Sequence, residues 1–179
     1  MGPGDQGVDK HRAIIVSGFT AIGKTYFSSK SAEPGRGIDL DVIDLDSSTY
    51  SKGPGFPENY LADIRKAAEK PCVVLISTHP RLADQLDKEG YYVAHVYPDS
   101  SADAKKAWLD RLEKREEEGK SSRLYKLTDE NWELWFGRQE EPSERRWTLP
   151  NDQYLSDIFG SINASFEEFK RHPREQGRA

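Results

Sequence analysis

The sequence contains one cysteine, Cys72, and no long hydrophobic run. A single cysteine excludes an intramolecular disulfide framework and a zinc cluster built from cysteines, and it is typical of a reducing compartment. No apolar run approaches the length of a transmembrane helix, and no signal peptide precedes His11. We therefore expect a cytoplasmic protein that does not associate with a membrane.

An excess of positive charge is also missing, because the 179 residues carry a net charge of −5 at pH 7. This charge argues against non-specific nucleic-acid binding by bulk electrostatics, although local basic faces can still exist. The length is that of one ordinary domain. We expect a single domain at residues 11–170, between a flexible leader at 1–10 and a flexible tail at 171–179.

Short apolar runs of strand length alternate with helical patterns along the chain. Their β-branched and aromatic content predicts four strands, at Ala13–Val16, Leu40–Leu45, Cys72–Ile76 and Tyr91–Tyr97. A short fifth strand is expected within "WTLPNDQYL". Strands separated by helices indicate an α/β fold with a mainly parallel sheet built from βαβ units.

Helical spacing predicts several helices in the second half of the chain. One covers 102–118 and ends at Gly119, and another covers 128–139, with Asp129 and Glu130 in its first turn. The last helix presents one apolar stripe that is expected to pack on the sheet, formed by Leu155, Ile158, Phe159, Ile162, Phe166 and Phe169.

The segment Gly18–Thr25 fits G-x-x-x-x-G-K-[ST] between a buried strand and a helix. Glycines admit phosphate close to the backbone, a helix N-terminus favours anions, the lysine serves the β- and γ-phosphates, and the hydroxyl serves Mg²⁺. The alternative is a glycine-rich turn with an incidental Lys-Thr pair. We expect ATP and Mg²⁺ as cofactors, and nucleotide binding by Gly18, Ala21, Ile22, Gly23, Lys24, Thr25 and Tyr26.

Two carboxylates stand at the end of the second predicted strand, in "DVIDLDSS". Asp44 and Asp46 would share one face near the carboxyl edge of the sheet, where such folds bind ligands. We assign Asp44, with Thr25, to the metal and Asp46 to the proton of an acceptor hydroxyl. The alternative is a turn role for Asp44 and a capping role for Asp46.

The third predicted strand ends without an acidic residue, in Ser77-Thr78-His79. A Walker B carboxylate is therefore missing from its expected place, which disfavours a motor-type ATPase. Ser77 or Thr78 could assist the water shell of the metal, and His79 could contact a substrate; the alternative is that these residues cap the next helix.

A candidate lid covers about 101–126. On its helix, Arg111 and Arg115 fall beside the apolar Trp108 and could reach a phosphate as its charge develops in the transition state. "GKSSR" at 119–123 would form the mobile tip. The alternative is that Arg111 pairs with Asp110 or Glu118 and that Arg115 lies along the edge of the core.

Aromatic residues divide into two expected roles. Three with helical spacing are expected in the core: Trp132, Trp135 and Phe136. Three that follow the carboxylate pair are candidates for stacking on an acceptor base: Tyr50, Phe56 and Tyr60.

With the phosphate loop, "DLDSS", "FPENY", "VVLISTH" and "WLDRLEKR" in this order, the chain from Arg12 to Gln139 resembles the small P-loop kinases of the nucleotide-kinase type. It looks most like the phage-associated branch that includes the 5-hydroxymethyluracil DNA kinases. The resemblance implies a three-layer α/β P-loop kinase fold with a helical lid and a five-stranded sheet, ordered 2-3-1-4-5.

The resemblance also implies residue roles. In these kinases an aspartate at the end of the second strand serves the acceptor hydroxyl, and the matching residue here is Asp46. Arginines on the lid helix serve the phosphates, and the matching residues are Arg111 and Arg115. Shikimate-kinase-like relatives divide the metal and acceptor roles over an Asp-x-Asp, which matches Asp44 and Asp46.

The acceptor is less defined, because only Lys52 and Arg65 follow the Asp46 segment where a nucleoside monophosphate kinase has a basic pair for the acceptor phosphate. We expect an ATP- and Mg²⁺-dependent kinase with a nucleotide-type acceptor, including the 5-hydroxymethyl group of a modified pyrimidine in DNA. A nucleoside monophosphate kinase, a nucleotide-dependent regulatory ATPase or switch, and a nucleotide-binding module without turnover are the alternatives.

Overall fold

A computed structural model describes residues 11–31, 38–50, 53–136 and 145–172 of the chain. Four parts of the sequence-based predictions lie outside these residues: the leader at 1–10, the tail beyond residue 172, Lys52 and the end of the 128–139 helix. Within them, no helix combines the length and the apolar character that crossing a membrane requires.

The five strands form one parallel sheet in the order β2-β3-β1-β4-β5. They are β1 (Ala13–Gly18), β2 (Asp41–Leu45), β3 (Cys72–Ser77), β4 (Tyr92–Pro98) and β5 (Arg146–Leu149). Every residue of the central strand β1 is buried, which explains its continuous apolar run, because both of its faces are covered. The predicted fold class and strand order are confirmed.

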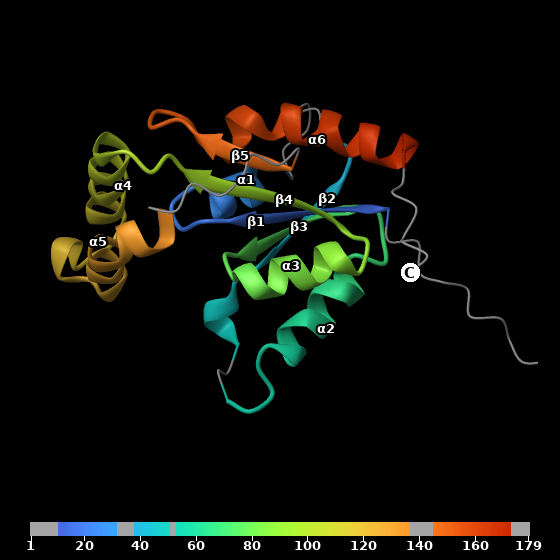
Figure 1. Ribbon diagram of the computed structural model, residues 1–179, viewed down its shortest axis with the longest axis horizontal. Helices are drawn as coiled ribbons and strands as arrows, with labels where there is room; N and C mark the ends of the chain where they lie inside the picture. The colour runs from blue at the N-terminus through green and yellow to red at the C-terminus, as the bar shows by residue number, and fades with distance from the viewer. Residues whose placement is uncertain (1–10, 32–37, 51–52, 137–144, 173–179) are drawn as a thin grey trace, which may run out of the picture.

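Helices cover both faces of the sheet and make a three-layer structure (Figure 1). Helices α1 (Lys24–Ser31) and α6 (Leu155–Arg171) lie on one face, and α2 (Glu58–Ala67) and α3 (Pro80–Lys88) lie on the other. Helices α4 (Ala102–Arg115) and α5 (Arg123–Phe136) stand together at the carboxyl ends of the strands. We call α4 and α5, with the segment that joins them, the lid hairpin.

The apolar stripe predicted for the last helix is confirmed. Leu155, Phe159, Ile162 and Phe166 on α6 are buried in the core on the α1 side of the sheet. The hydroxyl of Tyr92 in β4 donates to the carbonyl of Ile162 at 3.1 Å, which fixes the helix along the sheet.

The joint of the lid hairpin differs from the prediction. Helix α4 ends at Arg115 and α5 begins at Arg123, with a 3₁₀ turn, η2 (Gly119–Ser121), between them. Three successive glutamates follow Arg115, and like negative charges are unfavourable at a helix C-terminus. The hydroxyl of Ser122 accepts from the backbone N–H of Tyr125 and starts α5 early. Asp129 and Glu130 therefore lie inside the helix and not in its first turn.

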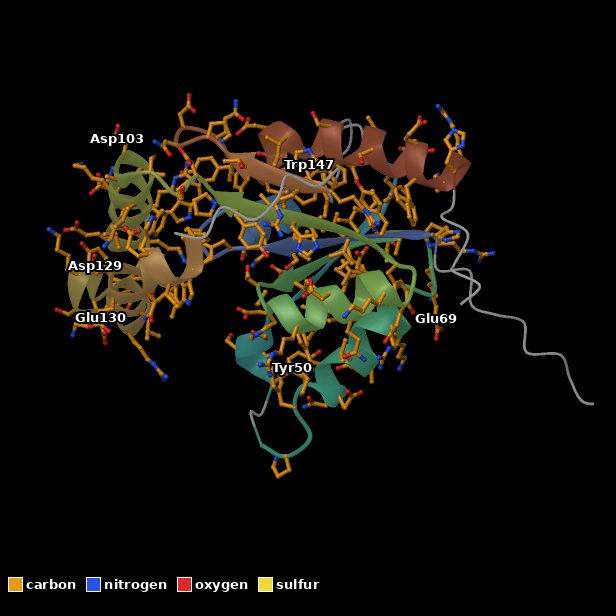
Figure 2. All side chains as sticks on the ribbon, viewed as in Figure 1. Tyr50, Glu69, Asp103, Asp129, Glu130 and Trp147 are labelled. Atoms are coloured by element: carbon orange, nitrogen blue, oxygen red, sulfur yellow. The ribbon has the colours of Figure 1, made fainter. Side chains whose placement is uncertain are left out.

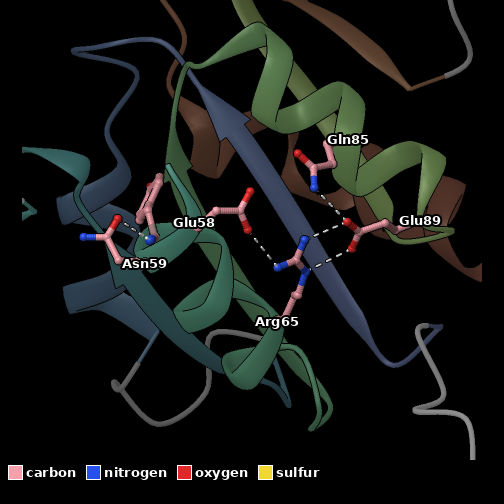
Figure 3. Close-up of polar contacts among 6 residues, drawn as sticks. Glu58, Asn59, Arg65, Gln85 and Glu89 are labelled. Carbon is pink, nitrogen blue, oxygen red and sulfur yellow. Dashed lines mark hydrogen bonds and ion pairs between the residues drawn. The ribbon is translucent and has the colours of Figure 1, made fainter. Parts of the chain in front are cut away.

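Arg65 joins α2 to α3 at the amino edge of the sheet, far along both helices from the phosphate loop (Figure 3). Its Nη2 lies 2.7 Å from Oε1 of Glu89 and its Nε 3.1 Å from Oε2, in a two-point contact. Glu58 lies 3.8 Å away and Gln85 donates to Glu89 at 3.2 Å. Arg65 therefore stabilises the packing of α2 on α3 and is not positioned to bind an acceptor.

Replacing Arg65 with methionine should lower the free energy of unfolding by about 1 kcal/mol, since a partly exposed two-point charged contact is lost. Urea unfolding measures the change. Lys66→Met at the neighbouring exposed position is the matched control and should have little effect. Equal stability of the two variants would contradict a stabilising role for the contact between Arg65 and Glu89.

Candidate active site

The residues of the predicted phosphate loop form a tight turn between β1 and α1. A Cβ atom added to Gly18 would overlap Cδ1 of Ile22, so a larger residue at this position would force the Ile22 side chain to move. Gly23 has a φ of +91° and Ala21 a φ of 61°. Such turns let backbone N–H groups face an anion at the start of a helix, so the loop fits a bound phosphate group.

The lid hairpin and α6 hold this loop in place. The backbone N–H of Phe19 donates to Val96 of β4 at 3.1 Å, and the indole N–H of Trp108 donates to the carbonyl of Thr20 at 3.0 Å. The N–H of Leu155 donates to the carbonyl of Ile22 at 2.8 Å. The loop is therefore fixed by elements that follow it by many residues in the sequence.

Lys24 is half-buried beneath the loop, and its ammonium donates to the carbonyl of Gly18 at 2.6 Å. Burial lowers the pKa of Lys24 to about 8, although the charges of Asp44 and Asp46 partly oppose this effect. The charge of Arg115 lowers the same pKa further. The structure thus brings together four of the residues predicted for the site within electrostatic reach of one another.

Asp44 lies half-buried on β2, next to the start of α1. Burial raises the pKa of its carboxyl, while Lys24 and a hydrogen bond from the side chain of Thr25 act in the opposite direction. Thr25 and Asp44, the two residues predicted for the metal, are therefore in contact. A hydroxyl and a carboxylate are suitable ligands for Mg²⁺ when phosphate oxygens complete its coordination, so the residues fit the ion.

The described residues contain no group of three or more His, Cys, Asp or Glu side chains arranged to bind a metal on their own. A Mg²⁺ ion that is shared with nucleotide phosphates does not require such a group, because it is held by one or two protein ligands.

Asp46 directly follows β2 and caps the short 3₁₀ turn η1 (Ser47–Thr49). Its Oδ1 accepts from the N–H of Ser48 at 2.8 Å, so the capping role considered from the sequence is present. Burial raises the pKa of Asp46, but hydrogen bonds from Ser48 and Ser77 and the charge of Lys24 outweigh it and leave the pKa below its usual value. The cap therefore also orients an ionised carboxylate toward the loop lysine.

An aromatic cluster lies behind Asp46, between η1 and α2. Tyr60 is fully buried, and its hydroxyl donates to the carbonyl of Leu45 at 2.6 Å and accepts from the N–H of Ser77 at 3.2 Å. The expectation that Tyr60 stacks on an acceptor base is wrong, because its ring belongs to the core. Tyr50 and Phe56 remain partly exposed, and the Tyr50 hydroxyl donates to Asp63 at 2.8 Å (Figure 2).

His79 links the segments that follow β2 and β3. Its Nε2 lies 3.0 Å from the hydroxyl of Ser47. It occupies the N-cap position of α3 but makes no capping hydrogen bond with its side chain. The link therefore ties the Asp46 segment to the neighbouring strand.

Arg111 is held between two aromatic rings that both contact the phosphate loop, those of Trp108 and Tyr154. Its guanidinium lies 4.3 Å from the ring centres of both Trp108 and Tyr154, and it donates to the carbonyls of Asn151 and Gln153. Arg111 lies beside Trp108 as predicted, and its hydrogen bonds connect the 151–153 loop to α4. Neither Asp110 nor Glu118 is its partner in these contacts.

Arg115 occupies the last turn of α4, where its Nε lies 3.2 Å from Oε1 of Glu116. It lines a surface groove of about 680 Å³ together with Arg123. The side chain is 56% exposed. Its position near Lys24 and its exposure leave it more accessible to a phosphate than Arg111.

The core prediction for the α5 aromatics holds for two of the three. Trp132 and Phe136 are buried, whereas Trp135 is 44% exposed, and its ring centre lies 5.7 Å from that of Phe19 in the phosphate loop, in an edge-to-face contact.

Two residues of this region were missed from the sequence. Arg81 lies exposed in the first turn of α3, close to the carboxyl end of β3. The sequence signal for this position is Pro80, because proline is favoured at the first position of a helix and Arg81 follows it. Tyr154 begins α6 and packs 3.2 Å from the position of a Cβ on Gly23. No sequence pattern indicated this contact, because it joins distant segments.

The chain matches no profile of a known protein family and no curated protein sequence. A solved structure titled "Crystal structure of APE1195" is similar over 89% of this chain and 94% of that chain, with 18% sequence identity and a TM-score of 0.40. Similarity at this level carries no argument about the function or the site.

Replacing Lys24 with methionine should raise the free energy of unfolding at pH 7 by about 1 to 2 kcal/mol, because a buried charge is removed. The folded-state pKa of about 8 lies below that of an unfolded lysine, so the wild type gains stability as the pH rises from 8 to 10. The advantage of the variant should therefore shrink over that range.

Urea unfolding at pH 7 and pH 10 tests this dependence. Lys66→Met, on the exposed side of α2, controls for the loss of one positive charge. A Lys24→Met protein that is less stable than the wild type at pH 7 would contradict the burial of the charge.

Proposed function

We propose that the protein is a small P-loop kinase of the nucleotide-kinase type, which transfers the γ-phosphate of ATP to a hydroxyl group of a nucleotide-type acceptor. The observation that carries the proposal is the meeting of Lys24 and Thr25 with Asp44 and Asp46 at the carboxyl ends of β1 and β2. This combines a phosphate-binding loop with ionisable carboxylates on the side where an acceptor would approach.

The residues divide the chemistry among them. Lys24 would exchange its bond to the Gly18 carbonyl for phosphate oxygens, which restores a charged partner to the buried ammonium. Thr25 and Asp44 would hold Mg²⁺, which neutralises phosphate charge when bound. Asp46 would accept the proton of the acceptor hydroxyl. The oxygen of that hydroxyl would bond to the γ-phosphorus of ATP while the bond from the γ-phosphorus to the leaving ADP oxygen breaks.

Arg115 is the lid residue best placed to contact the transferring phosphate. It already acts on Lys24 electrostatically, and its exposed guanidinium is held only by the neighbouring Glu116 in the described contacts. Arg111 would instead support the site by holding the 151–153 loop, which leads into Tyr154 above Gly23.

The charges around Asp46 favour a hydroxyl as the group that is phosphorylated. Arg65, which could have bound an acceptor phosphate, is held by Glu89 at the opposite edge of the sheet. An acceptor with a 5-hydroxymethyl pyrimidine in DNA meets this requirement, and Arg81 would contact its backbone phosphate.

Replacing Asp46 with asparagine should lower the rate of phosphoryl transfer by about a hundredfold or more, because the proton acceptor is lost. ATP affinity should stay nearly unchanged. A labelled-ATP screen against nucleosides, nucleoside monophosphates, polynucleotide 5′ ends and hydroxymethyluracil-containing DNA measures the transfer. Asp63→Asn on α2 is the matched control and should retain activity.

Two outcomes would contradict the kinase assignment. Transfer to water alone, unchanged by Asp46→Asn, would indicate a nucleotide-dependent switch. Absence of ATP consumption that depends on Lys24 would indicate a binding module without turnover.

Replacing Arg81 with methionine should raise the KM for the acceptor about tenfold, since a charged contact to an acceptor phosphate is lost. The KM for ATP should not change, because Arg81 lies on the α3 side of the site. Steady-state kinetics with the best acceptor of the screen measure both constants. Arg65→Met is the control for a lost arginine, and an equal effect of the two variants would contradict the assignment of Arg81.

A further inference from the structure

Helix α5 has a second apolar face that the described residues leave uncovered. Its inner face is formed by Thr128, Trp132 and Phe136, which are buried. Among the described residues, five large hydrophobic side chains are exposed, and three of them lie on α5: Leu127 at 37%, Leu134 at 70% and Trp135 at 44%. This concentration on one helix is unusual for a surface that meets only water.

The uncovered face has the spacing of a helix-pairing seam. Leu124, Leu127, Asn131 and Leu134 follow one another at intervals of three and four residues, which places them along one side of the helix. We call these four residues the α5 stripe. Leu124 and Leu127 also line the groove of about 680 Å³ at the joint of the lid hairpin. The other residues that line this groove are charged or polar, so the two leucines form its apolar part.

The charges along α5 have an order that its own helix dipole disfavours. The basic residues Arg123 and Lys126 lie in its first turn, and the acidic Glu130 and Glu133 lie in its second half. Negative charge is favourable near a helix N-terminus and positive charge near its C-terminus, which is the reverse of this order. No ion pair with another described residue compensates these four charges.

A second α5 that runs in the opposite direction would compensate them. It would place the acidic half of one helix beside the basic half of the other and would cover both stripes. Leu134 of one copy would then meet Leu124 of the other. Helix α5 stands at one end of the molecule, beyond the carboxyl ends of the strands (Figure 1).

We propose that the α5 stripe is the contact surface of a homodimer, in which the α5 helices of two copies pair in antiparallel orientation. The contact is isologous, since the same surface of each copy meets the other across a two-fold axis. Its small area corresponds to a dimer that dissociates on dilution.

Sedimentation velocity of the full chain over a hundredfold range of concentration tests the proposal. We expect a monomer–dimer equilibrium in the wild type and a dissociation constant at least tenfold weaker for Leu134→Glu. Because Leu134 is 70% exposed, this change should leave the thermal unfolding of the monomer unaltered. Lys66→Glu on α2 is the control for a surface charge change and should dimerise like the wild type.

Charge-swapped variants test the orientation and the identity of the partner. Arg123→Glu with Lys126→Glu gives an acidic helix, and Glu130→Lys with Glu133→Lys gives a basic one. Each double variant should be monomeric alone, and an equimolar mixture should form a one-to-one dimer.

A wild type that stays monomeric at every concentration would overturn the proposal. A monomer is also the result expected if residues 137–144 of the same chain occupy the α5 stripe in place of a second copy. Dimerisation that survives both Leu134→Glu and the charge changes would place the interface elsewhere and would also overturn it.

Discussion

The buried ammonium of Lys24 is the constraint on which the rest of the site depends. It lies beneath the phosphate loop with the Gly18 carbonyl at 2.6 Å, and its lowered pKa shows that the protein alone does not fully compensate its charge. Asp44 and Asp46 reduce the cost from the neighbouring strand. A group with several negative oxygens would complete this balance, which is the role that the proposed function gives to the phosphates of ATP.

The parallel sheet makes this arrangement possible. Since β1, β2 and β3 run in the same direction, the loop, the Asp44 and Asp46 pair and the Ser77 segment all meet at one edge. The lid hairpin is part of the same construction, because Trp108 holds the loop through the carbonyl of Thr20. Both of its helices contact the loop, because Trp135 and Phe136 of α5 also pack on Phe19.

The parts of the site that depend on local chemistry could be predicted. The glycine spacing and the Lys24-Thr25 pair have a specific physical use in a short segment, and the position of Asp44 and Asp46 near the carboxyl end of a strand indicated a place at the ligand-binding edge of the sheet. The contacts of Arg111 could not be predicted, because its partners are backbone carbonyls of Asn151 and Gln153, and every residue carries the same carbonyl. Sequence spacing placed it correctly beside Trp108, but it did not show which way it would turn.

The sequence by itself determined the α/β class, the strands, the phosphate loop and the buried stripe of α6, because these depend on hydrophobic period and on residues with few conformational alternatives. Only the tertiary structure decided which polar side chains are available. Tyr60 is buried in the core and Arg65 is held by Glu89, whereas Arg81 is exposed near the carboxyl end of β3. The reason is that availability depends on partners from distant segments, whose identity no local pattern contains.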